Sequence, residues 1–119
     1  MDSKTTVEDL KGMCGRFCDE RDWSQFHNAK DLAIGIASEA GELLELFRFK
    51  SEEESDEMAR ASRRTDVSEE LADTLYFVLR FAQVADIDLS EALEDKLAKN
   101  ALKYPADRVR GCNKKYDEY

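Results

Sequence analysis

The chain has 119 residues, of which 42% are hydrophobic and 38% are charged, and it contains five glycines and one proline. This length suits one domain, and the scarcity of glycine and proline favours helices with short connections over a sheet with many turns. The formal net charge of -9 excludes a general electrostatic attraction to DNA, RNA or anionic lipid. We therefore expect an all-α protein that receives any polyanionic ligand only at a local site.

The sequence carries no pattern typical of a membrane span or a secretion signal. Its apolar runs stay below the ~18 residues of a transmembrane helix, and the N-terminal MDSKTTVEDL lacks a basic and then apolar region. Cys14, Cys18 and Cys112 are an odd number of cysteines, which makes a poor disulfide framework. We expect a cytoplasmic protein with reduced thiols.

Start signals and hydrophobic spacing predict two helices in the first half of the chain. A capping-box pattern at Thr5 and Glu8 precedes apolar residues at helical spacing, which predicts a helix over about 6–21. Asn28 provides the next N-cap signal, and the apolar stripe that follows predicts a helix reaching Phe49.

The second half is expected to hold a charged connection and two further helices. The segment SEEESDEMARASRRT, residues 51–65, has almost nothing to bury, so we expect a solvated connection, with a short helix as the alternative. Asp66 opens a helix that runs to about residue 85. An N-cap at Asp88 opens another helix, which ends just before Pro105 because proline disfavours helix at the preceding residue.

These elements predict a helical bundle of four main helices over residues 1–105 and a polar tail over residues 106–119. The helix over 66–85 is apolar over more than half of its circumference, which is more than its neighbours in a small monomer could cover. We therefore expect oligomerisation through helix faces, as a homo-oligomer.

Two glutamates of the second helix lie on or beside its buried stripe. At about 100° per residue, Glu39 falls about 20° from Leu32, in the middle of the stripe, and Glu42 lies at the edge of the stripe. The same projection directs Glu45 away from the stripe, so we interpret Glu45 as an ordinary surface charge.

The third helix repeats this arrangement with Glu70 and Asp73, again three residues apart. If the two helices pack side by side, their inward acids converge, and burying an uncompensated carboxylate costs several kcal/mol. A cation bound between these acids would compensate their buried charge. Oxygen ligands favour a hard ion, and Mg²⁺, which leaves coordination positions for phosphate oxygens, is the usual choice.

Other readings of the acids stay open at this point. They could pair with a lysine or arginine from another helix, or the helix could be rotated from the projected phase. A di-iron bundle is nearly excluded, because it uses Glu-x-x-His pairs and the only histidine, His27, is not placed that way. A non-catalytic helical interaction module with buried ion pairs remains the alternative function.

The acids and their flanking segments resemble a known family. EAGE at 39–42 followed by ELAD at 70–73, each on a long apolar helix, is similar to the ExxE…ExxD signature of the MazG-like all-α nucleotide pyrophosphohydrolases. The segment FCDERDWSQFHNAKDL precedes these acids, and Lys96, Asn100 and Lys103, the last followed directly by Tyr104 and Pro105, come after them. Both blocks resemble the dCTP pyrophosphatase branch. The resemblance covers most of the chain. It implies Mg²⁺-dependent attack of a metal-activated water on the α-phosphorus of a (d)NTP, yielding monophosphate and pyrophosphate in nucleotide-pool house-cleaning.

The resemblance also assigns roles to matching residues. The metal ligands would be Glu39, Glu42, Glu70 and Asp73, and the catalytic carboxylates would be Glu39 and Glu42. Glu39 is the first candidate to accept the proton of the water. The family implies a homodimer or a dimer of dimers, with sites at the subunit contacts.

Base-binding residues are assigned by the same resemblance. Trp23 and His27 match positions that line the base pocket, and Phe49 stands where a second tryptophan is expected. A phenylalanine stacks but lacks the indole donor, which weakens the expectation of a strict cytosine preference. The alternatives are a rim tryptophan and a helix-start histidine with no ligand.

Phosphate-binding residues are expected on the fourth helix. Lys96, Asn100 and Lys103 fall at i, i+4 and i+7 and so share one face. The resemblance assigns this face to the phosphates, and the alternative is an ordinary solvated face.

Overall fold

The computed structural model describes residues 1–115, 117 and 118, and within them the protein consists of helices, turns and loops without a strand. The predicted all-α class is confirmed. The chain divides into two compact units, Met1–Asp86 and Ile87–Tyr119, which are described separately below.

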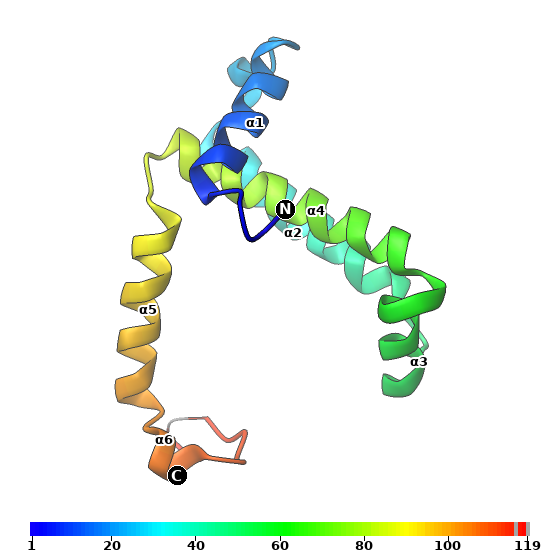
Figure 1. The fold of residues 1–119 in the computed structure, drawn as a ribbon, viewed down its shortest axis with the longest axis vertical. Coiled ribbons are helices and arrows are strands. Elements are labelled where there is room, and N and C mark those ends of the chain that lie inside the picture. The colour runs from blue at the N-terminus through cyan, green and yellow to red at the C-terminus, as the bar shows by residue number, and fades with distance from the viewer. Residues whose placement is uncertain (116, 119) are drawn as a thin grey trace. The chain divides into compact units, whose positions relative to one another are not determined.

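The first unit is built around a pair of long helices (Figure 1). Helix α4 packs along α2 over much of its length, and its second half also contacts α1. Six elements follow one another along this unit: α1 (Val7–Asp19), the 3₁₀ turn η1 (Ser24–Phe26), α2 (Ala29–Leu46), α3 (Glu52–Glu57), the π-helical turn η2 (Met58–Ser62) and α4 (Arg64–Val84).

The N-terminal caps explain where the first two helices begin. The capping box of α1 uses Thr6 and Asp9, whose side chains and backbone amides exchange two hydrogen bonds of 3.0 Å. The predicted box at Thr5 was therefore one residue early, and the Thr5 hydroxyl instead accepts from the N-terminal amine at 3.1 Å. The N-cap at Asn28 is confirmed, since its side-chain oxygen accepts from the Asp31 amide at 2.9 Å.

The connection between the long helices differs from the prediction. Residues 51–65 were expected to be a solvated connection, but they hold α3 and η2. Ser51 caps α3 by accepting from the Glu54 amide at 3.1 Å, and three acids in its first turn interact favourably with the helix dipole. Met58 anchors the segment because its side chain is buried. Sequence reasoning missed this anchor, since one apolar residue gives no periodic signal.

Two helix ends also shift relative to the prediction. Helix α2 ends at Leu46 rather than Phe49, and α4 begins at Arg64 rather than Asp66. Asp66 does not cap the helix; it accepts a hydrogen bond from Arg63 Nε and forms an ion pair with it.

The core of the first unit is thin. Its fully or nearly buried apolar side chains are Cys18, Leu32, Met58, Leu79 and Ala82. The α2–α4 contact depends on close backbone approach as well, because a Cβ atom at Gly35 would lie 2.5 Å from the Phe77 ring. No helix among the described residues has both the length and the apolar character needed to cross a membrane.

The second unit contains α5 (Leu89–Lys103) and the short helix α6 (Ala106–Val109). Asp88 caps α5 as predicted, by accepting from the Glu91 amide at 2.9 Å, and α5 ends before Pro105 as predicted. No described side chain of α5 is buried, so its leucines do not form a core of their own. The division into residues 1–105 and 106–119 stays a prediction.

We predict that Gly35→Ala lowers the free energy of unfolding by about 1–3 kcal/mol, because the added methyl overlaps the Phe77 ring in a packed contact. Gly41→Ala is the matched control on the same helix. A Cβ at Gly41 meets no atom within 4 Å, so this change should stabilise the protein by about 0.5–1 kcal/mol. Urea unfolding of both variants measures the difference, and equal effects would contradict the close α2–α4 contact.

Candidate active site

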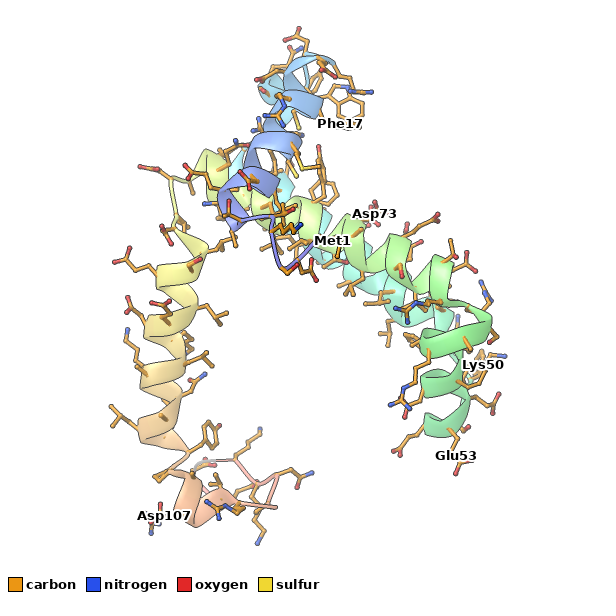
Figure 2. All side chains as sticks on the ribbon, viewed as in Figure 1. Met1, Phe17, Lys50, Glu53, Asp73 and Asp107 are labelled. Carbon is orange, nitrogen blue, oxygen red and sulfur yellow. The ribbon has the colours of Figure 1, made fainter. Side chains whose placement is uncertain are left out.

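Helices α2 and α4 bring the predicted acids together. One carboxylate oxygen each from Glu39, Glu70 and Asp73 lies within 4.8 Å of the others. The carboxyl group of Glu42 interacts with both Glu39 and Glu70, which places it beside the same group. We call these four residues the acid cluster. Figure 2 labels Asp73, which lies on α4.

The acid cluster contains two orphaned buried atoms. The Oε2 atoms of Glu39 and Glu70 are inaccessible to solvent and have no hydrogen-bond partner. The ion pairs that the structure describes all involve other acids. The observed geometry therefore does not support the alternative in which the inward glutamates pair with a lysine or arginine.

The surroundings of Glu39 and Glu70 raise the pKa of both carboxyl groups. Burial raises the pKa of Glu39, and the charges of Glu42 and Asp73 raise it further. Burial also raises the pKa of Glu70, followed by its interaction with Glu42. The folded state thus holds these protons more tightly than the unfolded chain does. In the metal-free protein, these two carboxyl groups therefore stabilise the folded state fully below their ordinary pKa of 4.5. That stabilisation is lost as the pH rises through their raised pKa values.

A divalent cation fits this donor set. The ligands are carboxylate oxygens from two helices, which hard cations prefer, and a bound cation would satisfy the orphaned oxygens and offset the repulsion between the acids. The three residues whose carboxylate oxygens lie close enough together to hold it are Glu39, Glu70 and Asp73.

An aromatic cavity adjoins the acid cluster. It has a volume of about 430 Å³, which is in the range of small-ligand sites. Asp73 belongs to both features, so a ligand in the cavity would extend directly toward the acids. The cavity is lined by Met13, Cys14, Phe17, Trp23, Ala72, Asp73 and Tyr76.

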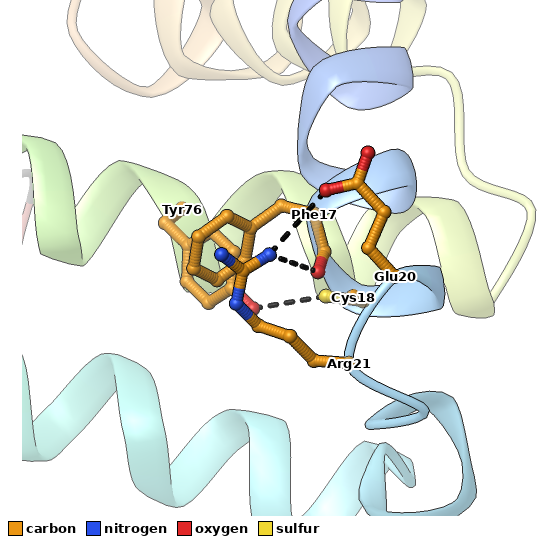
Figure 3. A network of polar contacts seen from close by, with 5 residues as sticks. All are labelled: Phe17, Cys18, Glu20, Arg21 and Tyr76. Atoms are coloured by element: carbon orange, nitrogen blue, oxygen red, sulfur yellow. Dashed lines mark hydrogen bonds and ion pairs between the residues drawn. The ribbon is translucent and has the colours of Figure 1, made fainter.

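Figure 3 shows two of the aromatic walls, Phe17 and Tyr76, with Cys18 and Arg21 beside them. Phe17 meets Trp23 edge to face, with centroids 5.6 Å apart, and meets Tyr76 in the same way at 6.1 Å. The Tyr76 hydroxyl and Cys18 Sγ are hydrogen-bonded at 2.9 Å, and the guanidinium carbon of Arg21 lies 3.8 Å from the Phe17 ring centroid. Burial and the bond to Cys18 raise the pKa of Tyr76, so its hydroxyl stays protonated. The walls therefore offer ring surfaces more than free polar groups.

Sequence reasoning missed part of this cavity. Phe17 and Cys14 are among the residues at helical spacing that predicted the helix over 6–21, and the sequence assigned no role to Tyr76. The available signal was that the stripe of α1 is richer in polarizable and aromatic residues than a contact with one helix requires. Only the tertiary contact shows that the stripe faces a cavity.

The predicted base-binding residues separate in the structure. Trp23 lines the cavity. His27 is not among the lining residues, and its Nδ1 accepts a hydrogen bond of 2.9 Å from Arg80 Nε. Phe49 is also outside the lining: it is 91% exposed, has a φ of 64°, and carries the Arg48 guanidinium 4.7 Å from its ring centroid.

The predicted phosphate-binding residues belong to the second unit. Lys96, Asn100 and Lys103 all lie on α5, at the helical spacing that the sequence predicted. Lys96 and Lys103 are exposed and Asn100 is partly buried.

The fold and the site together define an all-α protein whose donor set can hold a cation between two helices, beside a cavity with aromatic walls. Residues 34–119 match the model of the MazG-like family. The chain therefore belongs to the MazG-like family.

Curated relatives agree with this assignment. The chain is 37% identical to dCTP pyrophosphatase 1 of Bos taurus over 98% of its own length and 69% of the relative. It is 36% identical to dCTP pyrophosphatase 1 of Homo sapiens over 95% of its length and 67% of the relative.

A solved structure is similar as well. A crystal structure of a pyrophosphatase from Archaeoglobus fulgidus superposes with a TM-score of 0.77 at 39% identity, covering 82% of this chain and 91% of that one. These matches confirm the predicted resemblance and the class of nucleotide pyrophosphohydrolases.

We predict that Mg²⁺ raises the melting temperature of the wild-type protein by relieving repulsion in the acid cluster. A ligand at 100 times its Kd stabilises the folded state by about 2.7 kcal/mol. Glu39→Gln should raise the melting temperature of the metal-free protein at neutral pH and reduce the further gain from Mg²⁺, because it removes a buried charge that the cation would offset.

Glu45→Gln provides the control, because Glu45 lies on α2 in an exposed ion pair with Arg48. Thermal scans at several Mg²⁺ concentrations should show a wild-type response in this variant. A wild-type response in Glu39→Gln would place the cation elsewhere.

Proposed function

We propose that this chain is a Mg²⁺-dependent nucleoside triphosphate pyrophosphohydrolase that converts dCTP, or a related or base-modified deoxynucleotide, to the monophosphate and pyrophosphate. The observation that carries this proposal is that the acid cluster, which holds two buried oxygens without a hydrogen-bond partner, shares Asp73 with the aromatic cavity. The relatives named dCTP pyrophosphatase 1 support the choice of nucleotide.

The proposed reaction uses the acid cluster at the α-phosphorus. Bound Mg²⁺ would supply Lewis-acid stabilisation of charge on the phosphoryl oxygens. Glu39 accepts the proton of the attacking water, and Glu42 is its catalytic partner. The new bond joins the water oxygen to the α-phosphorus, and the bond from that phosphorus to the α,β-bridging oxygen breaks.

The aromatic cavity is proposed to bind the base. Trp23, Phe17 and Tyr76 supply ring surfaces, and the Tyr76 hydroxyl is already bonded to Cys18. The base edge would therefore meet few free hydrogen-bonding groups. A pocket of this kind selects by shape and stacking more than by edge recognition, which is compatible with modified bases.

Residues outside the cavity complete the proposal. Phe49, exposed on its own chain, is proposed to reach the base site of a neighbouring subunit. Lys96, Asn100 and Lys103 are proposed to contact the phosphates, since charge-assisted donors are needed for a triphosphate in a chain of net charge -9.

The cellular setting is part of the same proposal. Cys14, Cys18 and Cys112 are free thiols, which is compatible with a reducing compartment. We propose a cytoplasmic location and a role in nucleotide-pool house-cleaning.

The proposal predicts Mg²⁺-dependent pyrophosphate release in a screen of common and modified dNTPs. Glu39→Gln and Glu70→Gln should each lower kcat at least about 100-fold, because each removes a group that acts on the reacting phosphate or its cation. Glu45→Gln should stay within about twofold of the wild type, since its exposed charge lies outside the acid cluster.

Two results would contradict this assignment. Full activity of Glu39→Gln would move catalysis away from the acid cluster. Absence of pyrophosphate release from every nucleotide would favour the non-catalytic helical interaction module.

A homodimer, or a dimer of dimers, is proposed from the apolar surface of α4. Leu71 is 57% exposed, and Leu75 is also exposed, although both lie on a long helix of the first unit. They border a groove of about 650 Å³ with mainly apolar walls, which a second copy of the chain would cover. The groove is lined by Asp2, Ser68, Leu71, Ala72, Thr74, Leu75 and Val78.

We predict that Leu71→Glu lowers the mass measured by light scattering from that of the oligomer to that of a smaller species. A charge buried in an apolar interface would lack a partner. Arg16→Glu, on the exposed side of α1, serves as the control for a change of charge. A monomeric wild type at micromolar concentration, or an unchanged mass in Leu71→Glu, would contradict this use of the groove.

A further inference from the structure

Arg80 on α4 is a buried charged side chain, only 7% exposed, that the proposed reaction does not use. Its guanidinium donates three hydrogen bonds to neutral acceptors. Nε donates to His27 Nδ1 at 2.9 Å and Nη2 donates to Ser24 Oγ at 3.0 Å. Nη1 donates to Gln83 Oε1 at 2.5 Å. Burying a charge among neutral partners costs desolvation energy, so the geometry that these bonds enforce needs an explanation.

Two of the three acceptors belong to the turn that carries Trp23. Ser24 follows Trp23 directly as the first residue of η1, and His27 closes the same turn. The Ser24 hydroxyl in turn donates to Asp19 Oδ1 at 3.1 Å, which links the guanidinium to a carboxylate at the end of α1. Arg80 therefore fastens this turn to α4.

The backbone of this turn includes one residue in a sparsely populated conformation. Asp22, immediately before Trp23, has a φ of 54°, in the left-handed region that non-glycine residues rarely adopt. The Trp23 amide donates to the Cys18 carbonyl at 3.0 Å, which ties only the start of the turn to α1.

The third acceptor of Arg80 is Gln83, which connects α4 to α1, the helix that carries the other wall of the cavity. Gln83 accepts from Arg80 through Oε1 and donates through Nε2 to the Lys11 carbonyl of α1 at 3.2 Å. The absence of a side chain at Gly15 leaves space for this contact, since a Cβ there would lie 2.8 Å from Gln83 Nε2. Arg80 thus connects α4 to both elements that carry the opposite walls, α1 and the Trp23 turn.

Spacing along α4 relates this network to the site. Asp73, Tyr76 and Arg80 occupy positions i, i+3 and i+7, which lie on one face of a helix. Along this face come an acid of the cluster, an aromatic wall of the cavity and the group that holds the opposing walls. The distance between Tyr76 and Trp23 is therefore set by bonds made from the same helix.

We propose that Arg80 is a positioning residue that fixes the width of the aromatic cavity by holding α1 and the Trp23 turn against α4, and that it thereby sets the affinity for the nucleobase without touching the nucleotide. The inference rests on the proposed function for its kinetic consequence but not for its structural one. In this arrangement His27 acts through Arg80, as the acceptor that orients the guanidinium.

The single tryptophan of the chain provides a direct test, because all tryptophan fluorescence comes from Trp23. In ligand-free Arg80→Met, the emission should shift to the red and acrylamide quenching should increase. The KM for the best nucleotide should rise about five- to tenfold with kcat little changed, as expected when binding alone is weakened. The response of the melting temperature to Mg²⁺ should match that of the wild type, since the acid cluster is intact.

Three further variants separate positioning from general damage. Ser24→Ala removes one acceptor and should shift both readouts in the same direction to a smaller extent, whereas Ser24→Thr keeps the hydroxyl and should restore them. Arg64→Met removes an exposed arginine from the same helix and should leave both readouts unchanged. A loss of folded protein lowers apparent kcat and does not change KM.

A folded Arg80→Met protein with wild-type Trp23 emission and KM would overturn the proposal. If Arg80→Met fails to fold, Ser24→Ala decides: wild-type emission and KM in that variant would overturn it. If the wild type hydrolyses no nucleotide, the proposed function fails, and the emission and quenching of ligand-free Trp23 still decide whether Arg80 holds the turn.

Discussion

Repulsion among carboxylates held between two helices is the constraint on which this structure depends. Glu39 and Glu70 place oxygens where neither water nor a donor reaches them, and Asp73 adds a third charge within 4.8 Å. The α2–α4 pair must hold these groups close through packing, although the first unit has few buried apolar side chains. Close backbone approach at Gly35 supplies part of that packing. The cluster is thus a local instability that becomes a binding site in the presence of a cation.

Helix α4 organises the remainder of the site. It contributes Asp73 to the acids, Tyr76 to the cavity wall and Arg80 to the bonds that hold the opposite walls. Because the three residues share one face of a continuous helix, their separations are fixed by helical geometry rather than by loops. Another part of α4 presents the apolar groove around Leu71 and Leu75. One element thereby links the chemistry to the surface that we propose for assembly.

Periodic features could be predicted from the sequence, and contacts between distant segments could not. The position of Glu39 on an apolar stripe predicted the acid cluster, because helical phase is a local property, and Asn28 and Asp88 were recognisable caps for the same reason. The α3 segment was expected to be a solvated connection, with a short helix only as the alternative, because its single anchor, Met58, is defined by tertiary burial. Arg80 escaped assignment because two of its three acceptors, His27 and Ser24, lie more than 50 residues away in the sequence.

Helix α1 lines the cavity but contributes none of the acids, and this separation has an evolutionary consequence. Met13, Cys14 and Phe17 come from α1, whereas Glu39 comes from α2 and the remaining cluster acids from α2 and α4. Substitutions on α1 can therefore remodel ligand preference while the reactive centre stays intact. Selection could diversify the accepted substrates of such a scaffold by drift along one short helix, with little penalty to the chemistry itself.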